Sequence, residues 1–260
     1  MITFNLHFTD CCNFSCKHCF VKKQGNELSF DNIKLIANKL AKYQHGNNIK
    51  IRVNLAGGEP LLSKNIQKII DYLYSLNLEI SMITNGYYLT SEFIVNNKNK
   101  ISMIGISVDS LDVNTNLKIG RCFNNNTISK DRLIYICKVI KDNGIALKIN
   151  TCVTSINKDE EINELLDAVK PERIKVLRAF CKGDKAIYNI SNAEWLAVKK
   201  KYSNVVFEDN DYMASSYLII DSEGNLSKDN LHILNNSLLN NSIEECLEKI
   251  KCEVTQKWDH

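Results

Sequence analysis

The sequence lacks any segment that could cross a membrane: nowhere do about 18 consecutive apolar residues occur, and no basic region precedes an apolar run at the N-terminus. It also lacks a long linker rich in proline, glycine or serine. Neither sign of charge dominates, since 33 basic residues stand against 30 acidic ones, and this balance excludes an extended nucleic-acid-binding surface. We therefore expect a cytoplasmic protein that binds neither membrane nor nucleic acid, with one main domain and a terminal extension.

Short β-rich runs alternate with helical patterns along the first 178 residues, a pattern that predicts a parallel sheet covered by helices. Ser29 can cap a helix whose apolar face carries Ile33, Ile36 and Leu40. The expected strands are 2–8, 49–56, 79–84, 101–107, 145–153 and 173–178, and the expected helices are 29–44, 64–77, 90–96, 127–143 and 158–169.

The pattern changes after about residue 179. We expect a helix at 191–202, strands at 204–208 and 216–221, and a last helix near 242–251. The segment 223–242 is rich in asparagine and serine and is expected to be a mobile loop. The sequence thus predicts an α/β protein with a catalytic unit at 1–178 and a short α+β extension at 179–260.

The ten cysteines, in a chain without an export signal, indicate reduced thiols and a metal centre rather than a disulfide scaffold. Cys12, Cys16 and Cys19 lie within eight residues directly after the first expected strand, where barrel enzymes carry their chemistry on loops. Clustered thiolates select soft metals, and three ligands leave one iron of a 4Fe-4S cluster open to a substrate. The alternatives are three incidental thiols, or a zinc site with a fourth ligand from His18, His7 or Cys11.

The expected strands have an unusually polar face. Strand side chains alternate between two faces, so the apolar residues face the helices and the polar ones point inward. The inward cations are Arg52, Lys148, Arg173 and Lys175, with Asn5, His7, Asn54 and Asn150 on the same face. Each unpaired buried ion costs several kcal/mol, so a polyanion such as a triphosphate is expected to bind there. Alternatively, each cation is a strand-end charge that reaches water, and His7 is an ordinary interior histidine.

The spacing C-x3-C-x2-C at Cys12 to Cys19 resembles the radical S-adenosylmethionine (SAM) superfamily. Gly57-Gly58-Glu59-Pro60, at the end of the second expected strand, resembles the GGEP motif, whose backbone binds the amino group of SAM in that superfamily. Alone, this motif would be a glycine-rich turn with proline at a helix start. After the cysteine motif, it strengthens the resemblance.

Within that superfamily the chain resembles the viperin family, in a prokaryotic-type form. The similarity runs through most of the chain and rests on these motifs: Asn5-Leu-His7-Phe-Thr, Asn54-Leu-Ala-Gly-Gly-Glu-Pro, Ile106-Ser107-Val-Asp109-Ser110, Ile119-Gly120-Arg121, Lys148-Ile-Asn150, Pro171-Glu-Arg173-Ile-Lys175-Val, Glu208-Asp-Asn210 and Ser216-Tyr217-Leu-Ile. Arg52 replaces a lysine of the family and Ala56 a serine.

The resemblance implies a partial (β/α)6 radical SAM barrel and a set of site residues. The cluster ligands would be Cys12, Cys16 and Cys19. The SAM contacts would be Gly57, Gly58, Glu59, Asn85, Ser107 and Arg121, with Arg121 on the carboxylate. The substrate contacts would be Asn5, His7, Arg52, Asn54, Lys148, Asn150, Arg173, Lys175, Asn210 and Lys257. Tyr217 would be catalytic.

The implied activity is dehydration of CTP, UTP or GTP to the 3′-deoxy-3′,4′-didehydro analogue. A 5′-deoxyadenosyl radical, generated from SAM at the cluster, would abstract the ribose 4′ hydrogen. The electron would come from a donor such as flavodoxin or ferredoxin, the protein would be a monomer, and the product would serve antiviral defence. Two alternatives stay open: a radical SAM enzyme that modifies a peptide, and a non-catalytic interaction protein that keeps the cluster.

Overall fold

The computed structural model describes residues 1–209, 217–228 and 236–250. Its centre is one nine-stranded sheet in the order β7-β6-β5-β4-β3-β2-β1-β8-β9. The six central strands are parallel, as expected. They are β1 (Ile2–Thr9), β2 (Ile51–Gly57), β3 (Glu79–Thr84), β4 (Ile101–Ser107), β5 (Ala146–Val153) and β6 (Arg173–Arg178).

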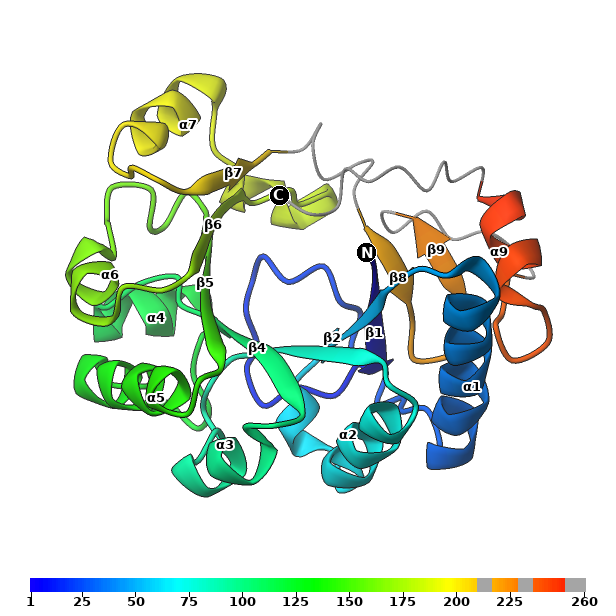
Figure 1. The fold of residues 1–260 in the computed structure, drawn as a ribbon. Coiled ribbons are helices and arrows are strands. Elements are labelled where there is room, and N and C mark those ends of the chain that lie inside the picture. The colour runs from blue at the N-terminus through cyan, green and yellow to red at the C-terminus, as the bar shows by residue number, and fades with distance from the viewer. Residues whose placement is uncertain (210–216, 229–235, 251–260) are drawn as a thin grey trace.

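The helices between these strands cover the outer face of the curved sheet, while the loop after β1 lies in its hollow (Figure 1). They are α1 (Phe30–Asn47), α2 (Ile66–Ser75), α3 (Ser91–Asn97), α4 (Val113–Ile119), α5 (Lys130–Asp142) and α6 (Asn163–Val169), with a short 3-10 helix at Pro60–Leu62. The sheet is open, which confirms a partial barrel.

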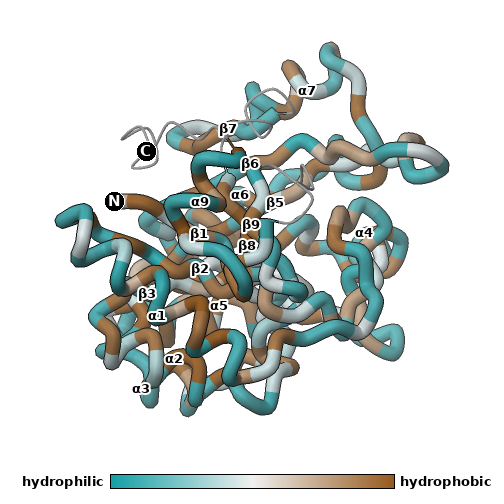
Figure 2. The backbone as a smooth tube through the Cα atoms, turned by 90° about the vertical axis from the view of Figure 1, so that its right-hand side faces the viewer, coloured by the Kyte–Doolittle hydropathy of each residue, from teal (hydrophilic) through white to brown (hydrophobic). Residues whose placement is uncertain are grey.

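The alternation predicted for the strands is confirmed by burial. In β1, Phe4, Leu6 and Phe8 are buried against the helices, whereas Asn5 and His7 on the opposite face are half-buried. In Figure 2 the hydrophobic colouring recurs along the strands and on the helices that cover them. The capping prediction also holds, because the Ser29 side chain accepts a hydrogen bond from the backbone of Asn32 at the start of α1.

The sequence analysis was wrong about the region between β4 and α6. Helix α4 was missed, and α5 begins at Lys130 rather than 127. The helix expected at 158–169 is shortened to α6, because Asn157 closes a turn just before it. Its Oδ1 accepts from the backbone and hydroxyl of Thr154, and its Nδ2 donates to the carbonyls of Asp109 and Cys152.

The chain after β6 adds strands at both edges of the sheet. Strand β7 (Val206–Glu208) pairs in parallel with β6, and β8 (Leu218–Ile220) pairs in parallel with β1. Strand β9 (Leu226–Lys228) is antiparallel to β8. The other elements are a 3-10 helix η2 (Gly183–Tyr188), α7 (Asn192–Lys199) and α9 (Ile243–Lys249).

The described part of 223–242 is ordered structure, which corrects the expectation of a mobile loop. It contains β9 and the fully buried residues Asn236 and Leu238. Asn236 fixes the segment because its Nδ2 donates to the carbonyls of Leu226, at 2.7 Å, and Cys246, at 3.3 Å. Within the described ranges, no helix is both long enough and apolar enough to pass through a lipid bilayer.

Candidate functional site

The three clustered cysteines lie on the loop after β1, and two later motifs hold that loop in place. The backbone N–H of Glu59 donates to the carbonyl of Cys11 at 2.7 Å. On the other side, the N–H of Ser15 donates to Gly120 and that of Lys17 to Ile119, at 3.0 and 2.9 Å. The cysteine motif, the GGEP motif and the Ile-Gly-Arg motif thus form one packed unit.

Two glycines permit this close packing. A Cβ on Gly58 would lie 2.0 Å from the carbonyl oxygen of Cys11, and one on Gly120 would lie 2.3 Å from that of Ser15. Gly120 also has a φ of +85°, which side chains disfavour. Any larger residue at either position would push the cysteine loop away from its support.

The three thiols lie within electrostatic reach of one another. Burial raises the pKa of Cys12 and raises that of Cys16 to about 12, and in both cases the neighbouring thiols of the loop add to the rise. A metal that binds the thiolates reverses this preference. The loop therefore offers three soft ligands that a metal centre would convert to their charged form.

The side chains of the cysteine loop do not form a ready-made site for a single metal ion among the described residues. In the part of the chain that the structure describes, no three His, Cys, Asp or Glu side chains converge closely enough to hold one metal ion. A tetrahedral zinc needs four convergent ligands, whereas the thiolates of a 4Fe-4S cluster bind different irons. The Nε2 of His18 lies 3.5 Å from the carboxylate of Asp109, while its buried Nδ1 has no hydrogen-bond partner among the described residues.

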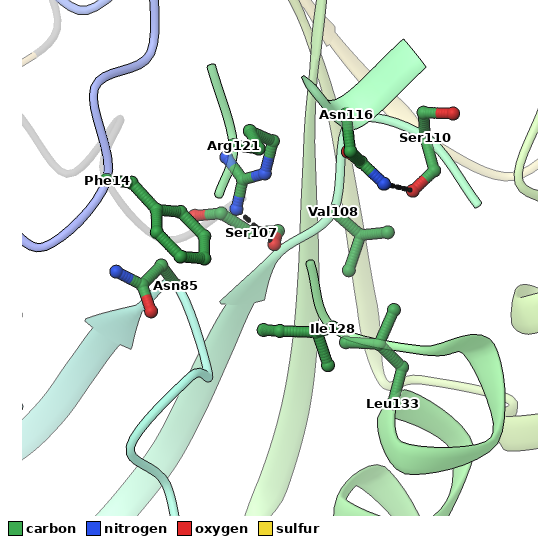
Figure 3. A pocket seen from close by; sticks show the side chains of 9 residues that line it. All are labelled: Phe14, Asn85, Ser107, Val108, Ser110, Asn116, Arg121, Ile128 and Leu133. Carbon is green, nitrogen blue, oxygen red and sulfur yellow. Dashed lines mark hydrogen bonds between the residues drawn. The ribbon is translucent and has the colours of Figure 1, made fainter. Parts of the chain in front are cut away.

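A small cavity lies beside the cysteine loop, at the carboxyl ends of β3 and β4 (Figure 3). It brings together three of the predicted SAM contacts, Asn85, Ser107 and Arg121, with Phe14 of the cysteine loop. The guanidinium of Arg121 donates to Asp109 Oδ2 at 2.9 Å and to the carbonyl of Ser107 at 2.6 Å. The buried Asp109 was missed as a site residue, although it stands within the quoted Ile-Ser-Val-Asp-Ser motif.

Unsatisfied polar atoms around this cavity mark it as a place for a ligand. Asn116 lines it, and its buried Oδ1 has no hydrogen-bond partner in the described structure. The buried Nδ2 of Asn13, on the cysteine loop, is also without an acceptor there. Buried polar groups normally have partners, so a ligand with both donors and acceptors, as SAM has, fits these side chains.

The carboxylate of Glu59 holds the loop after β3. It is fully buried and accepts hydrogen bonds from Thr84 Oγ1 at 2.7 Å and from the backbone of Asn85 at 2.7 Å and Leu61 at 3.1 Å. These bonds leave its side chain committed to protein groups. Glu59 thereby fixes Asn85, whose Nδ2 donates to Asn13 Oδ1 at 2.8 Å.

On the inner face of the sheet, side-chain hydrogen bonds connect two asparagines and a serine in a row. Asn5 Nδ2 donates to the carbonyl of Leu218, Asn54 Nδ2 donates to Asn5 Oδ1, and Ser81 Oγ donates to Asn54 Oδ1. The row crosses β8, β1, β2 and β3 and holds the polar side chains of this face in fixed positions. Further along the face, the buried Oδ1 of Asn150 has no partner among the described residues.

The other three predicted cations lie within electrostatic reach of Lys148, and carboxylates of the protein pair with Arg52 and Lys175. Arg52 donates to Glu79 Oε1 from Nε at 2.8 Å and from a terminal nitrogen at 2.5 Å. Lys175 forms an ion pair with the buried Glu208. Neither carboxylate was foreseen as a partner from the sequence.

The charge of Lys148 is poorly neutralised by its surroundings. It lies beside Arg173 in the register of β5 and β6, and no carboxylate in the described ranges forms an ion pair with it. Burial lowers its pKa to about 7, with Lys175, Arg173 and Arg52 adding to the fall and Glu208 opposing it. An anion bound beside Lys148 would offset this penalty.

Tyr217 lies at the start of β8, within the same network. Lys175 Nζ donates to its hydroxyl at 2.7 Å, and that hydroxyl donates to Glu208. The structure thus brings two predicted site residues, Lys175 and Tyr217, together at the carboxylate of Glu208 in β7. His7 also lies on this face, with a pKa that burial lowers to about 4. The predicted substrate residues Asn210 and Lys257 lie outside the described residues.

The chain is similar in sequence to a known protein family and to curated relatives. The family model of the radical SAM superfamily matches residues 6–169. An S-adenosylmethionine-dependent nucleotide dehydratase of Fibrobacter sp. is 31% identical, over 96% of this chain and 84% of the relative. One from Psychrobacter lutiphocae is 30% identical, over 85% of this chain and 80% of the relative.

Among solved structures, anSMEcpe with bound AdoMet superposes with a TM-score of 0.74 and 13% identity, covering 96% of this chain and 82% of that one. The same protein has also been solved with a bound peptide. At this identity the likeness concerns the fold alone, so it does not separate a nucleotide substrate from a peptide.

Proposed function

This chain belongs to the radical SAM superfamily and, within it, to the S-adenosylmethionine-dependent nucleotide dehydratases, and from that membership we propose that it converts CTP, UTP or GTP to the 3′-deoxy-3′,4′-didehydro analogue. The membership confirms the resemblance drawn from the motifs. The observation that supports the substrate proposal is the cationic inner face, where Lys148 and Arg173 lie side by side on neighbouring strands and Lys175 and Arg52 lie within electrostatic reach of Lys148.

The cofactors of this family are a 4Fe-4S cluster and SAM. Cys12, Cys16 and Cys19 would hold the cluster, and the backbone of Gly57, Gly58 and Glu59 would receive the amino group of SAM. Asn85, Ser107 and Arg121 would complete its site at the cavity beside the cysteine loop. When bound, these groups supply a 5′-deoxyadenosyl radical able to take the ribose 4′ hydrogen.

The inner face would bind the nucleotide. Arg52, Lys148, Arg173 and Lys175 would contact the triphosphate, since guanidinium and ammonium groups bind phosphate oxygens strongly. The amide row of Asn5 and Asn54, with Asn150 and His7, would face the ribose or base. Asn210 and Lys257 complete the proposed substrate contacts. In this arrangement the extension at 179–260 closes a site formed by the unit at 1–178.

Tyr217 would act on the 3′ hydroxyl. After the 4′ hydrogen is removed, the C3′–O bond breaks and the hydroxyl leaves as water, which requires one proton and one further electron. The Tyr217 hydroxyl would give the proton, and Lys175, which already donates to that hydroxyl at 2.7 Å, would return one. The electron comes from an external donor such as flavodoxin or ferredoxin.

We place the protein in the cytoplasm as a monomer, and its product in antiviral defence. A didehydro nucleotide has no 3′ hydroxyl, so a polymerase that incorporates it cannot extend the strand. This chemical consequence supports the antiviral role.

The test is anaerobic incubation of the reconstituted protein with SAM, dithionite and each nucleoside triphosphate separately. We expect 5′-deoxyadenosine and a didehydro product from at least one of CTP, UTP and GTP, and neither from the corresponding nucleoside. SAM cleavage that no nucleotide stimulates, in a protein with an intact cluster, would contradict the proposal and favour a peptide substrate. No SAM cleavage at all would favour an interaction protein.

Triphosphate binding is expected to weaken as the pH rises above about 7. Lys148 has a pKa of about 7 in the free protein, and a bound polyanion favours its charged form, so binding takes up a proton. Above about pH 7.5 phosphate groups are already fully ionised, so the substrate adds no opposing trend. Calorimetry between pH 7.5 and 9 should show the affinity falling by up to about tenfold per pH unit.

The matched control is Lys148→Arg, because arginine stays charged throughout this range. Its affinity for triphosphate should be nearly constant between pH 7.5 and 9. A variant that kept the wild-type slope would show that another group takes up the proton.

A further inference from the structure

The segment that follows β6 lies against the cysteine loop on the outside of the site. Lys185 Nζ donates to the carbonyl of Cys19 at 3.3 Å, and the thiol of Cys181 lies 3.9 Å from the carbonyl of His18. Lys17 stands over the ring of Tyr188 at 5.8 Å. Residues 180–188 and the cysteine loop therefore form one continuous surface directly over a proposed cluster ligand.

This surface has a strong local excess of positive charge. Residues 11–25 and 180–188 together contain five lysines and one acidic residue, Asp184, whereas the whole chain has a net charge of only +3. The lysines are Lys17, Lys22, Lys23, Lys182 and Lys185. None of them forms an ion pair within the described structure, although Lys100, Lys130 and Lys158 elsewhere do.

Exposed apolar side chains lie among these lysines. Phe180 is 52% exposed and Ile187 is 71% exposed, and the ammonium of Lys182 stands 5.5 Å from the centre of the Phe180 ring. Large apolar groups surrounded by charge are typical of protein interfaces, where aromatic side chains form the core and charged ones the rim. We call the surface of Lys17, Phe180, Lys182, Lys185 and Ile187 the basic face.

We propose that the basic face is the docking site of a small acidic protein that carries one electron. The inference rests on the proposed function, which requires electrons from outside, and it adds the place where they enter. One electron passes from the reduced carrier to the centre held by Cys12, Cys16 and Cys19, so the carrier is oxidised by one electron and no bond is made or broken. An acidic partner complements the unpaired lysines, whereas a second copy of this chain would present like charge.

The charged character of the basic face predicts a transient complex with the carrier. Electron-transfer complexes are small, and charge steers their encounter. The apolar pair Phe180 and Ile187 would exclude water at the centre, while the lysines would orient the carrier. Since Lys185 contacts the backbone of Cys19, a carrier seated here would lie close to the loop that receives its electron.

The test compares two reductants on one pair of variants. In Lys22→Glu/Lys182→Glu, which changes two exposed lysines of this surface, 5′-deoxyadenosine formation driven by flavodoxin and its reductase should fall at least about tenfold. Formation driven by dithionite, a small molecule that needs no docking site, should stay at the wild-type level. The control is Lys42→Glu/Lys68→Glu, which makes the same charge change at exposed positions of α1 and α2 and should leave both rates unchanged.

A binding measurement separates this proposal from the proposed function. Calorimetry with oxidised flavodoxin should show weaker binding to the Lys22→Glu/Lys182→Glu protein than to the wild type, and binding to the wild type should weaken with added salt. This binding measurement needs no turnover. If dithionite gave no chemistry, the proposed function would be overturned, but the measured flavodoxin binding would still test the docking site. Equal flavodoxin affinity and equal flavodoxin-driven rates in the two double variants would overturn the docking site.

Discussion

We expect the replacement of any one of Cys12, Cys16 and Cys19 by alanine to abolish iron-sulfur absorbance and SAM cleavage together. Each thiolate binds a different iron, so the loss of one leaves a second iron without a protein ligand. The cysteine loop is fixed by backbone bonds to Glu59, Gly120 and Ile119, and it cannot shift to bring another thiol into place. Visible absorbance after anaerobic reconstitution, and 5′-deoxyadenosine after addition of SAM and dithionite, measure the two effects.

Cys11→Ala is the matched control, because Cys11 is adjacent in sequence but touches the GGEP motif through its backbone carbonyl. Removing its side chain leaves that bond intact, so the variant should take up iron and cleave SAM. An inactive, iron-free Cys11→Ala protein beside an active Cys12→Ala protein would overturn the ligand assignment.

Tyr217→Phe is expected to separate SAM cleavage from product formation. The change removes only the hydroxyl that lies between Lys175 and Glu208, so the proposed cluster and SAM sites, whose residues follow β1 to β4, should stay intact. 5′-Deoxyadenosine should continue to form at a reduced rate while the didehydro product falls much further. The ratio of the two, measured by mass spectrometry with nucleotide present, is the decisive quantity.

The control for this prediction is Tyr202→Phe, which removes the hydroxyl of a buried tyrosine between α7 and β7 that is not part of the described hydrogen bonds of Lys175 and Glu208. It should keep the wild-type ratio, whatever it does to stability. If Tyr217→Phe also gave the wild-type ratio at the wild-type rate, Tyr217 would be a packing residue on a strand edge. The phenol would then have no part in the departure of the 3′ hydroxyl.

Much of the sheet was predictable because buried parallel strands have strong local signals. Strands β3 and β4 have the bounds expected from the sequence, 79–84 and 101–107, since their apolar runs end at polar or glycine-containing turns. Helix α4, Val-Asn-Thr-Asn-Leu-Lys-Ile, was missed because seven residues are too few for a helical period to stand out. Its start is set by Asp112, whose side chain accepts from the backbone of Thr115.

The sequence predicted which face of the sheet the candidate site residues occupy, but not which residues form ion pairs there. Alternation along one strand showed that Arg52 and Lys175 point inward. It could not show that their partners are Glu79 and Glu208, which are 27 and 33 residues away along the chain. Those pairings depend on how neighbouring strands are aligned, and alignment across a sheet is set by packing rather than by any one segment. The motif resemblance predicted more candidate site residues than periodicity did.

The position of β8 has a consequence for the order of folding during synthesis. Strand β1 has β2 on one side and β8 on the other, and β8 is separated from it by more than 200 residues, as the Asn5 to Leu218 bond shows. While the chain is emerging from the ribosome, one edge of β1 stays unpaired until residues 218–220 have been made. Contacts of such long range are slow to form, and an open strand edge invites pairing with other chains. The interval before β8 docks is therefore the period in which this protein is most exposed to aggregation.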